Sequence, residues 1–312
     1  MATVCDCNAS LGNSGLPNCV YIPNVTYKLI VTPTFDSTGA KNYIDTTATL
    51  DTAFFTDLLN AGRSGATNTD EKQRIYPIGA FKNVEDVRGE DVTESFNDNS
   101  TSFIQEGTRT FTGMIIDRPS PTLLGKMKSW RCSQISVYVV DIDGNLYGNG
   151  SEADKLYPIR LDSETWSPKF MKTADATVAK LQLDFTYAKD EADEDIKMIL
   201  ADETTPDVRD LNGLLDVNAA AATSISTTGF VTSLTYDYGS AVTAQNFKGA
   251  VLADFDLNEV SPTPGAIVIT SVTESPDGTY TFVIPAATSA DVLELDLQKD
   301  GYEMTTLTIT IP

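Results

Sequence analysis

The sequence predicts a mainly β protein, in which an antiparallel β-sandwich with one or two short helices precedes an immunoglobulin-like (Ig-like) β-sandwich. Three segments, residues 181–187, 293–298 and 306–311, alternate apolar and polar residues with a period of two. This period places one set of side chains on a buried sheet face and the other in water, as in a half-exposed antiparallel sheet. The chain also has no histidine and 44 acids against 22 bases, so we expect a rigid, acidic building block.

The totals bound the class of protein. With 312 residues the chain is long enough for two domains that each bury a core. Its net charge of −22 disfavours nucleic acid as a tightly bound ligand and disfavours anionic membranes, because phosphate contacts need clustered Lys and Arg. The charge allows a surface that DNA passes without sticking, and solubility alone would also explain it. We expect no membrane span and no Sec-type export, because no long apolar run and no signal-peptide pattern is present.

We expect three parts: an extended N-terminal arm over residues 1–24, a β-sandwich assembly domain over 25–210 and an Ig-like domain over 215–312. The arm is rich in Asn, Gly, Ser and Pro and has no periodicity. In a monomer such an arm is usually loose, whereas in an assembly it often reaches onto a neighbour.

The assembly domain is expected to begin with a strand and a short helix. The strand runs over residues 25–31, with one face formed by Val25, Tyr27, Leu29 and Val31. Asp51 can cap a helix that ends near Asn60, with Gly62 close to its end. Residues 63–100 are polar and poorly patterned. A stretch of this length between strands indicates a functional or intersubunit loop.

Further strands and a second helix follow this loop. The strands are predicted near residues 102–105, 108–117, 135–139 and 145–147. Ser120 and Pro121 open the helix, since Pro is favoured at the first helical position after a Ser cap. The buried face of this helix is expected to consist of Leu123, Leu124 and Met127.

An acidic run follows the alternating strand at 181–187. Its acids, Asp190, Glu191, Asp193, Glu194 and Asp195, precede the apolar residues of 196–200. Acids in the first turn of a helix interact favourably with the positive end of its dipole. The run therefore predicts a helix start and requires no metal ion.

The composition changes near Asp210. Residues 211–312 contain two bases and twelve acids, and residues 219–228 have the composition of a linker. Strands at short intervals over about a hundred residues are typical of an Ig-like sandwich, here without the Cys…Trp…Cys signature of antibody domains. Six strands are expected, near residues 230–236, 250–257, 266–272, 279–284, 292–299 and 305–311.

The four cysteines, Cys5, Cys7, Cys19 and Cys132, favour no structural role. A chain of this size does not need the disulfide framework of a small secreted domain. Cys5 and Cys7 are too closely spaced for a zinc knuckle, and no histidine can complete a mixed site. We expect ordinary reduced thiols.

No catalytic, cofactor or metal residue is predicted, and the protein is not expected to be an enzyme. The absence of histidine removes the usual hydrolase triad. Gly12-Asn13-Ser14-Gly15 lacks the spacing of a nucleophile elbow, and Gly125-Lys126 lacks the glycines of a P-loop. Asp141-Ile142-Asp143-Gly144-Asn145 resembles the start of a calcium loop. It lacks the final glutamate, and a hairpin turn explains its residues.

The arrangement resembles virion structural proteins of tailed bacteriophages, and most specifically tail tube proteins. The resemblance rests on the arm, the sandwich with a helix at 121–130, the long loop at 63–100, the stretch from Phe103 to Phe111 through Trp130, and the appended Ig-like domain. It implies sandwich sheets that pair into a ring, rings that stack into a tube, and in some members an outward-facing Ig-like domain. The acidic charge fits the negative lumen that is frequent in such tubes and repels the DNA backbone.

We therefore expect a homo-oligomeric virion protein that is made in the host bacterial cytoplasm. Its partners would be further copies of itself, other virion proteins and genomic DNA that passes without tight binding. A neck ring, capsid-decorating or head-fibre protein is the alternative within this class. From another class, a surface carbohydrate-binding module could use Trp130, Trp166 and the Ig-like domain as a sugar platform. The missing export signal argues against that module.

Overall fold

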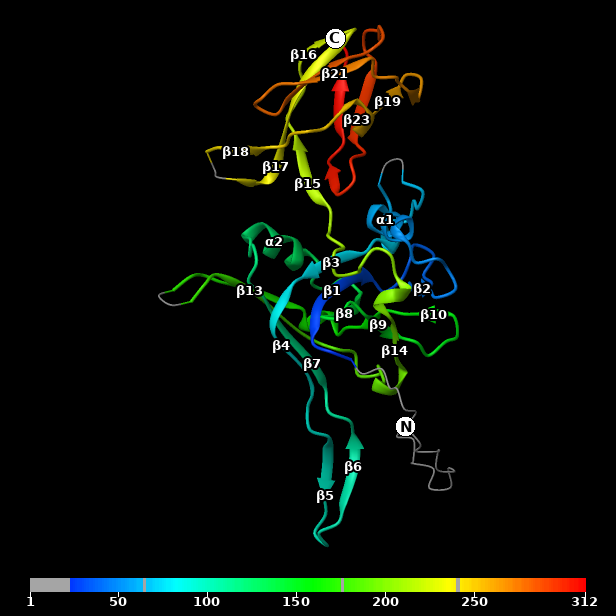
Figure 1. Cartoon of the computed structure of the whole chain (residues 1–312), viewed down its shortest axis with the longest axis vertical. Helices are drawn as coiled ribbons and strands as arrows, with labels where there is room; N and C mark the ends of the chain where they lie inside the picture. Colours follow the sequence, from blue (N-terminus) through cyan, green and yellow to red (C-terminus); the bar gives the residue numbers. More distant parts are fainter. Residues whose placement is uncertain (1–22, 64–65, 175–176, 240–241) are drawn as a thin grey trace.

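The computed structural model describes residues 23–312 except 64–65, 175–176 and 240–241. It confirms a mainly β chain built from several antiparallel sheets. Figure 1 shows two bodies along the long axis of the molecule, with a narrow β-ribbon projecting from the lower one. We call the lower body the first sandwich and residues 215–312 the C-terminal sandwich. Residues 1–22 of the predicted arm lie outside the described residues.

Two sheets form the first sandwich. One contains β14 (Ile196–Ile199), β9 (Leu146–Asn149), β8 (Ile135–Asp141), β1 (Thr26–Pro33) and β3 (Tyr76–Gly79) in that order, with β11 (Ile159–Arg160) beside β8. The other contains β12 (Ser167–Met171), β13 (Lys180–Thr186), β7 (Arg109–Ile115) and β4 (Phe81–Arg88) in that order. Two separate pairs are β2 (Ile44–Asp45) with β10 (Lys155–Leu156), and β5 (Val92–Ser95) with β6 (Thr101–Gln105).

The helices are short. The α-helices are α1 (Thr52–Asn60) and α2 (Pro121–Ser129), and the 3-10 turns are η1 (Glu71–Gln73), η2 (Ser163–Thr165), η3 (Asp193–Asp195), η4 (Ala201–Glu203) and η5 (Leu252–Asp254). Asp51 and Ser120 cap the two α-helices as predicted, because their side chains accept hydrogen bonds from the amides of Phe54 and Thr122. Of the expected buried face of α2, Met127 is fully buried, and Leu123 and Leu124 are partly buried.

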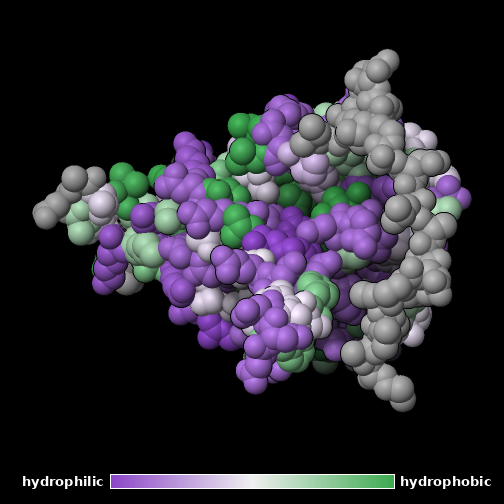
Figure 2. Space-filling view, turned by 90° about the horizontal axis from the view of Figure 1, so that it is seen from below, coloured by the Kyte–Doolittle hydropathy of each residue, from purple (hydrophilic) through white to green (hydrophobic). Residues whose placement is uncertain are grey.

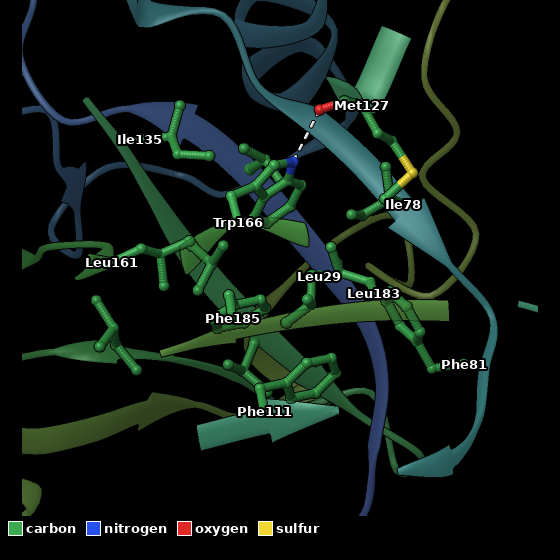
Figure 3. Close-up of a cluster of buried hydrophobic side chains, with 14 of the residues drawn as sticks. Leu29, Ile78, Phe81, Phe111, Met127, Ile135, Leu161, Trp166, Leu183 and Phe185 are labelled. Carbon is green, nitrogen blue, oxygen red and sulfur yellow. Dashed lines mark hydrogen bonds between the residues drawn. The ribbon is translucent and has the colours of Figure 1, made fainter. Parts of the chain in front are cut away.

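An aromatic stack fills the space between the two sheets of the first sandwich (Figure 3). The rings of Phe111 and Phe185 are 4.8 Å apart and nearly parallel, and the rings of Trp166 and Phe185 are 5.6 Å apart. Trp166 Nε1 donates a hydrogen bond of 2.8 Å to the Met127 carbonyl, which ties α2 to this core. The alternation over 181–187 is confirmed, since its four apolar residues, Leu181, Leu183, Phe185 and Tyr187, are buried and the residues between them are partly exposed.

The pair β1–β8 is buried on both of its faces. Leu29 faces the aromatic core, whereas Ile30 and Tyr138 belong to a second core under α1. The prediction of a single buried face for the first strand was therefore incomplete. It was wrong for Val25, which lies before β1 and is 59% exposed. Period-two reasoning detects one covered face and misses a strand that is covered on both.

The long loop predicted over 63–100 is wrong. Half of this stretch is regular structure, because it contains η1, β3, β4 and β5. The polar pattern misled the prediction for two reasons. In β4 a register shift between Lys82 and Glu85 breaks the alternation, and β5 is exposed along its whole length. Neither strand has the regular apolar face on which the prediction relied.

The helix predicted from the acidic run is also wrong. The acids pass through the single turn η3, and residues 196–199 form β14 at the edge of the first sheet. Short apolar runs do not distinguish helix from strand by periodicity alone. Tertiary pairing decides this one, because β14 pairs with β9 and the acids pair with arginines elsewhere: Arg160 binds Asp190 and Glu191, and Arg88 binds Asp193.

The C-terminal sandwich has its own core. One sheet contains β21 (Ser271–Glu274), β22 (Thr279–Val283), β17 (Gly229–Gly239), β15 (Leu215–Ala219) and β24 (Tyr302–Met304), with β16 (Thr223–Ser226) and β18 (Ala244–Asn246) beside β17. The other contains β20 (Gly265–Ala266), β19 (Phe255–Ser261), β23 (Val292–Leu297) and β25 (Leu307–Thr310). Residues 219–228 are not a linker, since they contain the end of β15 and all of β16. Their small polar residues suit exposed edge positions.

Alternation in this half is confirmed with one exception. Leu293, Leu295 and Ile309 are buried as expected. Asp296, expected in water, is only 8% exposed, and its carboxylate accepts a hydrogen bond of 2.6 Å from Thr306. This bond offsets the cost of burying a polar group.

Three ion pairs connect the sandwiches among the described residues. Arg74, which is buried, donates to both carboxylate oxygens of Glu303 at 2.9 Å. Lys126 of α2 pairs with Asp216 of β15 and lies 3.7 Å from the Asp237 carboxylate of β17. The division of the chain near residues 210–215 stays a prediction, but the two hydrophobic cores are formed by different residues.

Phe185→Ala should lower the free energy of unfolding of the first sandwich by about 3–5 kcal/mol, because Phe185 is only 2% exposed and stacks on two rings. Urea unfolding followed by tryptophan fluorescence measures this, since both tryptophans lie in this sandwich. Thr110→Ala, an exposed change on the same sheet, is the control and should cost less than about 1 kcal/mol. A similarly small loss for Phe185→Ala would contradict the assigned core.

Candidate assembly interface

The projecting ribbon is the feature of the first sandwich that does not contribute to its core. β4 and β7 leave the body as an antiparallel pair, and β5 and β6 continue it to a free tip (Figure 1). All residues of β5 and β6 are exposed. We call residues 89–108 the ribbon. Its strands pair only with each other, so each has one unpaired edge among the described residues.

Two glycines allow the chain to cross closely at the base of the ribbon. A Cβ atom on Gly107 would lie 1.9 Å from the Gly89 carbonyl oxygen, which no side chain can accept. The Gly89 amide donates to the Thr108 carbonyl at 2.9 Å, and the Asp91 carboxylate accepts from the Gly107 amide at 3.0 Å. This crossing separates the β4–β7 pair from the β5–β6 pair and needs glycine for close backbone approach.

Below this crossing, a network of charged side chains holds the ribbon on the body. Both oxygens of Asp86 accept hydrogen bonds of 2.7 Å from Arg109, the geometry of a bidentate pair. The Arg109 guanidinium lies 4.4 Å from the centre of the Tyr187 ring, a cation–π distance. Asp193 lies between two arginines, with its oxygens 2.9 Å from Arg88 Nε and 3.5 Å from Arg109 Nη1. The network thereby joins β4, β7, η3 and Tyr187, which directly follows β13.

The pKa shifts agree with this geometry. The hydrogen bond from Arg88 lowers the pKa of Asp193 below its ordinary value, and the nearby charge of Arg109 acts in the same direction. Burial is the largest effect on Arg109 and lowers its pKa, but the hydrogen bond to Asp86 and the charges of Tyr187, Asp86 and Asp193 together outweigh burial, so the net shift of the pKa is upward. Burial raises the pKa of Tyr187. At neutral pH Asp193 and Arg109 are therefore charged, and the Tyr187 hydroxyl is protonated.

The ribbon carries apolar side chains that the chain itself leaves exposed. Phe96, Phe103 and Ile104 are 47%, 55% and 55% exposed. Phe103 and Ile104 are consecutive in β6, where the pairing with β5 shifts register and leaves Ile104 without an opposite residue, as in a β-bulge. Asp98 closes the turn by accepting hydrogen bonds from the amide and hydroxyl of Ser100. Seen from the tip end, the surface is mostly hydrophilic with separate hydrophobic spots (Figure 2).

A cavity of about 260 Å³ lies in the angle between the ribbon and the body. Phe103 and Gln105 line it from the ribbon, and Tyr187, Lys189 and Ile196 line it from the body. The two arginines that line it, Arg88 and Arg109, are paired with Asp86, Glu106 and Asp193.

The two tryptophans considered for sugar binding lie in the core. Trp166 is fully buried, so it has no surface on which a sugar ring could stack. Trp130 is partly buried and contacts the rings of Tyr76 and Trp166. Both act as core residues, and the carbohydrate platform built on them is not formed.

The other candidate motifs form turns and ordinary surface. Asp141 is buried, and its carboxylate accepts hydrogen bonds from the amides of Asp143 and Asn145 and from the Tyr147 hydroxyl. These donors occupy the oxygens that a calcium ion would need. Within the described ranges there is no group of three or more acids, cysteines or histidines placed to hold a metal ion. Cys132 is an exposed free thiol, and Cys5, Cys7 and Cys19 lie outside the described residues.

Sequence reasoning missed the ribbon because it interpreted 63–100 as a loop. The signals present were the two glycines at 89 and 107 and the apolar residues around Phe103, which together indicate a twisted hairpin. Their symmetrical spacing about the Asp98 turn could have identified the two strands.

The comparisons with known proteins leave identity open. No protein-family model matches the chain, and no curated protein sequence matches it. Over the part of the chain that the structure describes, none of the helices has the length and apolar character needed to cross a membrane.

Asp193→Asn should loosen the ribbon base while leaving the fold intact, because it removes the carboxylate shared by Arg88 and Arg109. Hydrogen exchange at pH 7 should show faster exchange of the Gly89 amide, whose acceptor is the Thr108 carbonyl. Glu194→Gln, which changes the adjacent exposed acid, is the control and should leave this amide unchanged.

The ion pairs of Asp193 with Arg88 and Arg109 have a defined pH dependence. Because the pKa of Asp193 is lowered in the folded chain, its contribution is complete above the ordinary aspartate pKa of about 3.9 and is lost as the pH falls through the lower folded-state pKa. Exchange at Gly89 that is equal in Asp193→Asn and wild type would show that the pairing does not hold the ribbon.

Proposed function

We propose that this chain is a homo-oligomeric structural subunit of a tailed-bacteriophage virion, most like a tail tube protein whose stacked rings form the DNA conduit. The observation that carries the proposal is the ribbon, a projecting β-hairpin whose strands are exposed along their whole length and carry exposed apolar side chains. The protein would be made in the host bacterial cytoplasm and would function in the virion. No catalytic residues are assigned.

The ribbon supports assembly because an exposed two-stranded hairpin adds little stability to a monomer. An isolated two-stranded hairpin is marginally stable in water, and unpaired strand edges are ready templates for another chain. Phe103 and Ile104 are both more than half exposed, so the body of the same copy does not cover them. A neighbouring subunit would cover them and pair the free edges.

The rest of the fold supports a building block more than a receptor. The first sandwich has a stacked aromatic core and a second core under α1, so it can hold the ribbon in a fixed position. The C-terminal sandwich is attached at the opposite side of the body from the ribbon (Figure 1). It can therefore face outward while the ribbon engages a neighbour, as in members of the resembled family that carry an Ig-like domain.

The charge supports a conduit that DNA passes without binding. The chain carries −22, and acidic surfaces raise the electrostatic energy of nearby phosphates. A neck ring, capsid-decorating or head-fibre protein shares the arguments from the ribbon and the fold. The form of the assembly distinguishes these alternatives from a tail tube.

The purified full chain should form tubes or stacked rings in negative-stain electron microscopy. Phe103→Ser/Ile104→Ser should abolish these assemblies without unfolding the monomer, because both side chains are more than half exposed. Val251→Ser/Val268→Ser, a matched pair of exposed apolar residues on the C-terminal sandwich, should leave assembly unchanged. Single rings would favour the neck alternative, and a wild-type chain that stays monomeric would contradict self-assembly.

The assembled protein should retain no duplex DNA at low salt, where attraction to phosphate is easiest to detect. Repulsion by its acids acts over a Debye length of about 8 Å at physiological salt and over a longer range at lower salt. Filter binding of labelled duplex DNA to sedimented assemblies measures this. DNA retention that falls steeply with added salt would contradict the conduit proposal.

A further inference from the structure

The charges of the first sandwich are segregated along the chain. The ribbon, residues 89–108, contains five acids and no base. Residues 118–134 contain four bases and no acid, and residues 169–180 contain three bases and one acid. In a chain with twice as many acids as bases, two segments rich in bases are an exception that solubility does not explain.

Strand register places the acidic and basic segments at opposite ends of one sheet. β7 begins at Arg109, at the base of the ribbon, and ends at Ile115, shortly before α2. β13 is antiparallel to it, with Thr186 opposite Thr110 and Leu181 opposite Ile115. Both basic segments therefore lie at the end of the sheet far from the ribbon. α2 and β12 pack together there, and Figure 1 shows the ribbon pointing away from them.

Two charged groups at each end have no ion pair among the described residues. Glu90 and Glu94 of the ribbon have no ion pair among the described residues, and neither do Lys128 and Lys172 at the far end. All four side chains are exposed. This differs from the ribbon base, where arginines and acids neutralise one another.

Apolar surface accompanies the charge at both ends. The ribbon exposes Phe103 and Ile104, and Val178 is 59% exposed at the far end. We define the basic end by its described exposed or half-exposed residues Arg118, Lys128, Arg131, Lys172, Val178 and Lys180. A contact between the ribbon and the basic end would combine apolar burial with opposite charge, the combination typical of specific interfaces.

We propose that the ribbon of one copy lies on the basic end of the next copy. The partner is a second copy of this chain, which rests on the self-assembly in the proposed function. The contact uses different surfaces on the two copies and is therefore heterologous. Its surfaces lie at opposite ends of one sheet, so each added copy exposes a new ribbon and a new basic end. Repeated addition gives an open stack with a direction.

The ribbon has the length for this contact. Its strands extend about nine residues beyond the body, which at about 3.3 Å per residue is roughly 30 Å. This reach exceeds the spacing of several neighbouring strands at about 4.8 Å each. The ribbon of one copy can thus pass over the edge of the next body and contact α2 and the β12–β13 end together.

Charge reversal in matched pairs tests the contact on the full chain. One variant is Glu90→Lys/Glu94→Lys on the ribbon, and the other is Lys128→Glu/Lys172→Glu on the basic end. Each variant alone places like charges against each other and should lower the sedimenting fraction at least about tenfold. A mixture of the two should assemble again, because each ribbon then meets an oppositely charged end on the other variant.

Controls separate this proposal from the proposed function. Asp202→Lys/Asp300→Lys reverses two exposed acids outside both surfaces and should assemble as wild type does. If wild type forms tubes but the single-end variants also do, or their mixture does not recover, the ribbon contact is overturned and the tube proposal stands. If wild type does not assemble, both proposals fail. Recovery in the mixture alone establishes the head-to-tail contact.

Discussion

The antiparallel register of β7 is the constraint on which the rest of the first sandwich depends. This strand pairs with β13 on one side and with β4 on the other, and its residues Phe111 and Ile115 are buried in the aromatic core. A shift by one residue would turn these side chains to solvent and bring threonines into the core. The same strand continues into the ribbon. The packing of the core therefore fixes the direction of the ribbon, and the ionic network around Arg109 fixes its base.

The network around Arg109 also shows how an acidic chain uses its few bases. Arg109 forms ion pairs with Asp86 and Asp193 and stacks on Tyr187, while Arg88 forms ion pairs with Asp193 and Glu106. Exposed ion pairs of this kind contribute little individually, about 0–1 kcal/mol. Their value here is geometric, because planar bidentate pairing orients β4 and β7 at the point where the body ends. Because these arginines lie where the ribbon meets the body, they pair with the acids there and leave other acids unpaired on the surface.

The sequence predicted the strands that have one buried and one solvent-exposed face. It failed for strands that are buried on both faces or exposed on both faces. The alternation at 181–187 and the caps Asp51 and Ser120 depend on local chemistry, so they were found. β1 is covered on both faces by elements distant in sequence, and β5 is covered on neither, so neither shows a clear period of two. β14 forms a strand because β9 offers it a partner. Pairing of this kind is absent from any local pattern.

The sequence also did not predict the candidate interface, because the residue types that form it have no distinctive chemistry. A catalytic site can be recognised in a sequence because it uses residue types that few other roles require. A contact between copies is made of Glu, Lys, Phe and Ile, which occur throughout protein surfaces. The informative property is their separation in space, which depends on register: the Thr186–Thr110 and Leu181–Ile115 pairs place the basic segments at one end of a sheet and the ribbon at the other. A heterologous contact needs such a separation, because two complementary surfaces close together on one copy would bind each other and leave nothing for a neighbour. Rigid pairing through β7 holds the acidic and basic surfaces apart.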